Sequence, residues 1–145
     1  MKELTFALDV IDGWPPVAAE VIYCNKKKNG HEILNPPFFL KGVSVGDILN
    51  VVKDRVNGQV FEWNYLFKSS NSTIWLMNSD PSICEKTILK LNEIGCLSEY
   101  FFSFSLVAVS FPCTISADKI DHLVSEFEEQ GFSIAFPSWR HEENA

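Results

Sequence analysis

Two helical segments, each ended by a glycine and followed by a strand, dominate the second half of this chain. The first begins at Asp80-Pro81, because Asp caps helices and Pro suits the first helical position, and it ends at Gly95. The second begins after the N-cap Ser116 and ends at Gly131. Each helix has a single apolar stripe and therefore packs on one side only. The repeat favours a sheet that carries both helices on one face.

The strands around these helices complete a split βαβ pattern. Apolar runs predict strands at 73–77, 100–111 and 132–136. The alternation within the middle run shifts phase near Leu106, which predicts a bulge or bend in one strand. We therefore expect an α+β fold in which residues 72–139 form a ferredoxin-like β-α-β-α-β half, followed by a polar, frayed tail at 140–145.

The first half of the chain is typical of β structure. Alternating apolar residues predict five short strands, at 4–10, 19–24, 31–34, 48–52 and 60–67. Asn29-Gly30 is a strong hairpin signal between the second and third strands. We expect one compact domain over residues 1–145, with a β-rich half over 1–71 that either closes into a barrel or joins the sheet of the second half.

Residues 60–67 show the clearest alternation in the chain. One face carries four aromatic side chains: Phe61, Trp63, Tyr65 and Phe67. Burying a large side chain stabilises a fold by about 1.5–3 kcal/mol. We therefore expect this aromatic face to lie in the core.

Length and hydropathy indicate a self-sufficient core. With 145 residues and 46% hydrophobic content, the chain needs neither disulfides nor a metal to fold. No apolar run approaches the roughly 20 residues that cross a bilayer, and the N-terminus lacks the apolar stretch of a signal peptide. We expect a cytoplasmic protein with no membrane partner. The cysteines form no Cys-x-x-Cys pair and are predicted to be buried free thiols: Cys24, Cys84, Cys96 and Cys113.

The acidic charge is concentrated in the second half of the chain. Residues 1–79 carry 8 acidic and 8 basic side chains, whereas the remainder carries 11 and 4, for a net charge of −7. This balance argues against a nucleic-acid partner, because phosphate backbones are bound by Lys and Arg. The second helix carries five of the carboxylates: Asp118, Asp121, Glu126, Glu128 and Glu129. They are either a solvated face or a surface that steers a basic partner.

No catalytic or ligand-binding motif stands out. Cys84, in the first turn of one helix, could act as a nucleophile with His122 of the other. Cys84, however, lies on the apolar stripe of its helix, whereas His122 lies on the polar side of the other helix. We expect a protein that is not an enzyme, with a Cys84-dependent hydrolase as the alternative. The histidines have no metal-ligand spacing and no glycine-rich phosphate loop occurs, so we expect neither metal nor cofactor.

The segment Asp12-Gly13-Trp14-Pro15-Pro16 is the most unusual loop in the sequence. A Trp in such a loop is costly to leave exposed, so it either caps the end of a barrel or sheet or serves recognition. Trp is enriched among residues that carry binding energy at interfaces. Asp12 and Trp14 are therefore candidate partner-binding residues.

Several short motifs follow one another in a characteristic order: Phe6-x-Leu8, Asp12-Gly13-Trp14-Pro15-Pro16, Glu20, Asn35-Pro36-Pro37-Phe38-Phe39, Gly42-Val43-Ser44-x-Gly46-Asp47 and Ser72-Thr73. This order resembles a bacterial family of small uncharacterised proteins, domain of unknown function four-two-six-five, over nearly the whole chain. The family has no established catalytic residues. Its members resemble the small acidic proteins encoded beside secreted toxins.

The resemblance implies a cytosolic immunity protein that binds a cognate, basic toxin domain and occludes its active site. The second helix and the loop at 12–16 are the expected contacts. The alternative is a regulatory domain of ferredoxin-like type that binds a small ligand.

Overall fold

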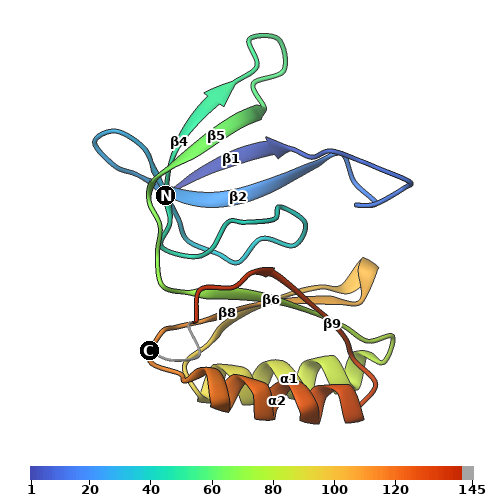
Figure 1. Ribbon diagram of the computed structural model, residues 1–145. Coiled ribbons are helices and arrows are strands. Elements are labelled where there is room, and N and C mark those ends of the chain that lie inside the picture. The colour runs from blue at the N-terminus through green and yellow to red at the C-terminus, as the bar shows by residue number, and fades with distance from the viewer. Residues whose placement is uncertain (142–145) are drawn as a thin grey trace.

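The computed structural model describes residues 1–141, and its strands form two separate sheets (Figure 1). The first is a closed barrel of β1 (Lys2–Ala7), β2 (Ala19–Lys26), β3 (His31–Ile33), β4 (Ile48–Lys53) and β5 (Val60–Phe67). Consecutive strands are antiparallel, and a single parallel pair, Phe6 with Val60, joins β1 to β5. The β-rich half therefore closes on itself and does not extend the second sheet.

The second sheet carries both helices on one face. Its elements are β6 (Ser72–Met77), α1 (Pro81–Glu93), β7 (Leu97–Phe101), β8 (Leu106–Phe111), α2 (Ala117–Glu129) and β9 (Ser133–Ser138). The strand order is β7-β8-β6-β9, and every neighbouring pair is antiparallel. Figure 1 shows α1 and α2 against the face that points away from the barrel.

The prediction of one bent strand at 100–111 is wrong. The segment forms part of a hairpin, in which β7 and β8 are joined by a short 3-10 helix (Phe102–Phe104) and by Ser105 in the left-handed conformation, φ 53°. A chain reversal shifts the phase of an apolar alternation just as a bulge does, so the sequence pattern did not distinguish them. The second half of the chain thus has four strands instead of the predicted three.

Both helix starts are confirmed. The Asp80 carboxylate accepts a hydrogen bond from the backbone N–H of Ser82 at 3.0 Å, and the Ser116 hydroxyl accepts from that of Lys119 at 3.1 Å. Such caps satisfy N–H groups that have no partner within the helix. The two helices therefore begin after Asp80 and Ser116, as the sequence predicts.

The two central strands of the second sheet, β6 and β8, are buried on both faces. Ile74 and Leu76 of β6 belong to the core beneath the helices, whereas Trp75 belongs to the core between sheet and barrel. The Trp75 indole N–H donates to the backbone carbonyl of Pro37 at 2.7 Å. This contact ties the central strand to the loop at 34–47, which connects β3 to β4.

The expectation that the aromatic face of β5 lies in the core is wrong. Phe61 is 59% exposed and Phe67 56% exposed, and only Trp63 packs against the barrel core. The pairing of β5 with β4 shifts register near both ends of the strand, and β5 meets β1 at one residue pair only. The barrel interior is filled instead by smaller inward-facing side chains and one phenylalanine: Leu4, Phe6, Ile22, Cys24, Ile33, Val43, Leu49 and Val60.

The predicted frayed tail is partly wrong. His141 is buried, with Nδ1 2.6 Å from the Ser72 hydroxyl and Nε2 3.0 Å from the Pro112 carbonyl oxygen. The backbone N–H of Arg140 also donates to the Ser72 hydroxyl, at 2.7 Å. These bonds hold the chain to β6 beyond the end of β9. Residues 142–145 of the predicted tail lie outside the described residues.

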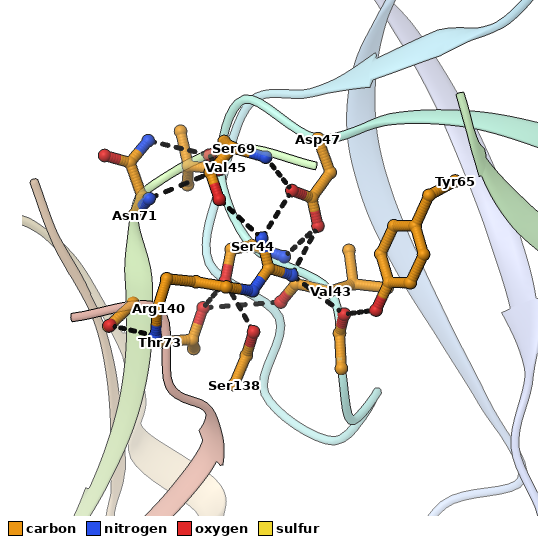
Figure 2. A network of polar contacts seen from close by, with 12 residues as sticks. Val43, Ser44, Val45, Asp47, Tyr65, Ser69, Asn71, Thr73, Ser138 and Arg140 are labelled. Carbon is orange, nitrogen blue, oxygen red and sulfur yellow. Dashed lines mark hydrogen bonds and ion pairs between the residues drawn. The ribbon is translucent and has the colours of Figure 1, made fainter. Parts of the chain in front are cut away.

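A buried ion pair joins the two halves (Figure 2). The Arg140 guanidinium donates to both carboxylate oxygens of Asp47, at 2.9 and 3.0 Å, and to the carbonyl oxygens of Ser69 and Gly42. Asp47 also accepts from the backbone N–H groups of Ser44 and Ser69, both at 2.8 Å. The pair therefore fixes the loop before β4 to the chain that follows β9.

Three of the four cysteines are buried free thiols as predicted, but Cys113 is exposed. Cys113 lies between β8 and the N-cap of α2, in a connecting segment where the chain turns at the surface. Within residues 1–141, no helix is long and apolar enough to cross a membrane.

Candidate functional site

The segment at 12–16, which we call the Trp14 loop, is a tight hairpin that projects from the barrel. Ile11 and Trp14 exchange backbone hydrogen bonds at 2.9 and 3.1 Å, and Asp12 and Gly13 between them have φ of 54° and 79°. Two central residues with positive φ are typical of a type I′ turn, for which Asp-Gly is a preferred sequence. The turn leaves Asp12 exposed and fixes the backbone of Trp14.

A concave surface lies beside this loop, and we call it the Trp14 groove. It has a volume of about 560 Å³ and lies between the loop, the start of β5 and residues 39–41. Its larger side chains are Ile11, Trp14, Phe39, Lys41, Phe61 and Trp63. The Trp14 ring meets Phe39 edge to face, with centroids 5.8 Å apart, yet 42% of Trp14 remains exposed. The Trp14 ring thus packs against Phe39 and still presents an aromatic surface to solvent.

Glu20 positions the aromatic floor of the groove. Its carboxylate accepts hydrogen bonds from three consecutive backbone N–H groups, of Phe38 at 2.5 Å, Phe39 at 2.9 Å and Leu40 at 3.0 Å. Burial raises the pKa of Glu20, and the three N–H donors oppose that rise. No local sequence pattern reveals this structural role, because Glu20 lies 18 or more residues from the groups that it binds.

A second cleft lies on the other side of Phe38 and Phe39, and we call it the Glu99 cleft. It has a volume of about 350 Å³ and lies between β2 of the barrel and β7 of the second sheet. The Asn35 amide donates to the half-buried Glu99 carboxylate at 3.4 Å, and burial raises the pKa of Glu99. Sequence reasoning missed this site, because it forms only when the two halves pack together.

We expect Glu99→Gln to raise stability at about pH 7 and to leave it unchanged at about pH 3, where the carboxyl is protonated in both states. The raised pKa means that the folded state holds this proton more firmly than the unfolded chain does. Wild-type stability is therefore lost as pH rises through that pKa, and the amide removes the loss. Urea unfolding at both pH values is the measurement, with Glu93→Gln at an exposed position of α1 as control. A lower stability of Glu99→Gln at neutral pH would contradict the expectation.

The acidic side chains of α2 do not adjoin the Trp14 groove. Asp118, Asp121, Glu128 and Glu129 are exposed on the helix layer, which lies across the second sheet from the barrel (Figure 1). Glu126 is also exposed but pairs with Lys90 of α1 at 2.7 Å. The structure therefore separates the two groups of candidate contacts that the sequence suggested.

The Cys84 thiol is poorly placed for catalysis. It is fully buried and donates to the carbonyl oxygen of Asn78 at 3.4 Å, whereas His122 is exposed and its Nδ1 lies 2.8 Å from the Asp118 carbonyl oxygen. Burial raises the pKa of Cys84, which disfavours the thiolate that a nucleophile requires. Among the described residues, no three His, Cys, Asp or Glu side chains are grouped to hold a metal ion.

Comparison with protein families gives a match to the family described as Domain of unknown function (DUF4265), over residues 20–134. The chain belongs to the DUF4265 family. The matched region of this DUF4265 protein includes Glu20, Phe39, which lines both clefts, and all of α2. The resemblance seen in the sequence motifs is thereby confirmed.

A comparison with curated proteins gives no match. Among solved structures, the DUF4265 protein is similar to the "Novel crystal structure of a hypothetical protein from Neisseria gonorrhoeae". The TM-score is 0.65 at 18% sequence identity, and the match covers 94% of this chain and 93% of the other. This similarity extends to the fold of both halves.

Proposed function

We propose that this DUF4265 protein is an immunity protein that binds a cognate toxin domain and covers its active site. The observation that carries the proposal is the Trp14 groove, a concave surface in whose lining Trp14 and Phe61 both expose aromatic surface. Exposed aromatic side chains around a pocket are typical of the centre of a protein interface. The acidic charge of the chain favours a basic partner, because complementary charge speeds association.

The Trp14 groove is a better contact surface than α2. A typical interface covers about 800 Å² on each partner, which is too little to include both the groove and a helix across the sheet from it. The exposed face of α2 is also highly charged, whereas the groove is concave and partly apolar. We therefore assign the buried contact to the groove and a steering role to the exposed carboxylates of α2.

Trp14→Ala is expected to weaken toxin binding by about thirtyfold or more, because truncating a central aromatic residue costs about 2 kcal/mol or more. The measurement is calorimetry with a catalytically inactive form of the cognate toxin domain, for which the domain encoded by the adjacent upstream gene is the one to purify first. Phe136→Ala is the matched control, since Phe136 is a half-exposed aromatic residue on β9, away from the groove.

Contrasting variants test where the toxin binds. If Glu128→Lys/Glu129→Lys abolishes binding while Trp14→Ala leaves it unchanged, the contact lies on α2 and not in the groove. The immunity role itself is tested by survival, since cells that express the active toxin should live only when this protein is present. Survival without it, or absence of a complex at low salt, would contradict the proposal.

The Glu99 cleft supports a second candidate, a regulatory domain that binds a small ligand. We propose that the second half is of ferredoxin-like type, on the basis of its β-α-β-β-α-β order and the strand order β7-β8-β6-β9. A half-buried carboxylate in a cleft that Phe38 and Phe101 also line suits an amine-bearing metabolite. Such a ligand should raise the melting temperature of the wild type but not of Glu99→Gln.

A further inference from the structure

Basic side chains occupy inward-facing positions on four successive strands of the barrel. In each strand the buried residues mark the inward side, as Leu4 does in β1, Cys24 in β2 and Leu49 in β4. Because side chains alternate along a strand, the inward positions continue to the ends of β1, β2 and β3. On β4 the register shifts just before Lys53, and Lys53 is placed on the inward side by its pairing with the buried Val60 of β5. Those positions are held by Lys2, Lys26, His31 and Lys53.

Strand pairing brings these residues to one region, which we call the basic end of the barrel. Lys26 is paired directly with His31, and His31 is paired in turn with Leu49 of β4. Lys2 is paired with Cys24, the inward residue that precedes Lys26 on β2. All three lysines are exposed, so their ammonium groups are accessible from solvent. The chain as a whole is acidic, which makes this grouping of cations unusual.

His31 lies beneath these lysines and lacks hydrogen-bond partners. It is only 6% exposed, and neither ring nitrogen has a partner within residues 1–141. Buried polar side chains are nearly always hydrogen-bonded, because an unpaired group loses its hydration without compensation. Burial and the charges of Lys26, Lys2 and Lys53 lower the pKa of His31. The ring is therefore neutral at neutral pH and has one N–H to donate.

We propose that the basic end of the barrel binds a phosphate group, held by Lys2, Lys26 and Lys53, with His31 as a hydrogen-bond donor. Lysine is a common phosphate ligand, because its ammonium acts as a mobile point charge with three donors. A phosphate with a charge of about −1.5 to −2 balances several lysines better than one carboxylate does. This proposal does not rest on the proposed immunity role, and no toxin is needed to test it.

The test is an NMR titration of the full-length protein, with inorganic phosphate in one arm and adenosine monophosphate in the other. We expect the His31 ring signals to move on addition of ligand. We also expect the His31 pKa to rise, since a nearby anion stabilises the imidazolium. Lys2→Gln/Lys26→Gln/Lys53→Gln should weaken binding by about tenfold or more. The control Lys68→Gln/Lys86→Gln/Lys119→Gln removes the same charge from exposed positions elsewhere and should preserve binding.

The two ligand arms separate the sources of the phosphate. Equal affinities would indicate free phosphate, and tighter binding of the monophosphate would indicate a nucleotide. Unmoved His31 signals with both ligands at millimolar concentration would overturn the proposal. Equal weakening by the two triple variants would overturn it as well, because the attraction would then depend on net charge alone.

Discussion

Arg140→Met is expected to lower the free energy of unfolding by about 3–5 kcal/mol, the usual cost of leaving one charge of a buried pair without its partner. Asp47 is fully buried, and both of its carboxylate oxygens accept from the Arg140 guanidinium. Methionine fills a similar volume but donates nothing. Asp47 would keep the N–H groups of Ser44 and Ser69, which offset part of the loss.

Urea unfolding measures this effect, with Lys68→Met as the control. Lys68 is exposed above the Tyr65 ring at 5.1 Å, so its loss should cost less than about 1 kcal/mol. The double variant Asp47→Asn/Arg140→Met should be less destabilised than the sum of its single variants, because the partners interact directly. A cost for Arg140→Met as small as that of the control, or strict additivity, would contradict the assignment.

Glu20→Ala is expected to destabilise the protein by about 3 kcal/mol or more, since each buried N–H left without an acceptor costs about 1–3 kcal/mol. Three N–H groups lose their acceptor together, those of Phe38, Phe39 and Leu40. The same change should loosen the floor of the Trp14 groove, because Phe39 contacts Trp14. A weakened toxin complex should accompany the loss of stability.

Glu20→Gln separates the acceptor role from the charge. The Gln carbonyl oxygen can still accept from the N–H groups of Phe39 and Leu40. Its NH2 group would face the backbone N–H of Phe38, and two donors form no hydrogen bond. We therefore expect a smaller loss than for alanine, measured by urea unfolding. Glu32→Ala, which removes a half-buried carboxylate 3.6 Å from Lys27, is the control and should cost less than about 1 kcal/mol. Equal losses of stability for Glu20→Gln and Glu20→Ala would contradict the acceptor role of Glu20.

The candidate site was only partly predictable from the sequence. The Trp14 loop stood out because Asp-Gly and Pro-Pro are local signals of a turn. The Glu99 cleft was not predictable, because its walls come from β2, the loop at 34–47 and β7. Likewise, His31 had no recognisable motif, and its grouping with Lys2 and Lys53 follows from barrel closure.

The sequence by itself determined the local elements of this protein. Both helix caps and all five strands of the first half follow from hydrogen bonds and alternation within a few residues. The tertiary structure alone decided that the aromatic face of β5 is exposed, that residues 97–111 form a hairpin, and that Arg140 reaches Asp47 across 93 positions. Alternation shows that a strand has two different faces. Which face is covered depends on the packing of distant segments, which no local pattern encodes.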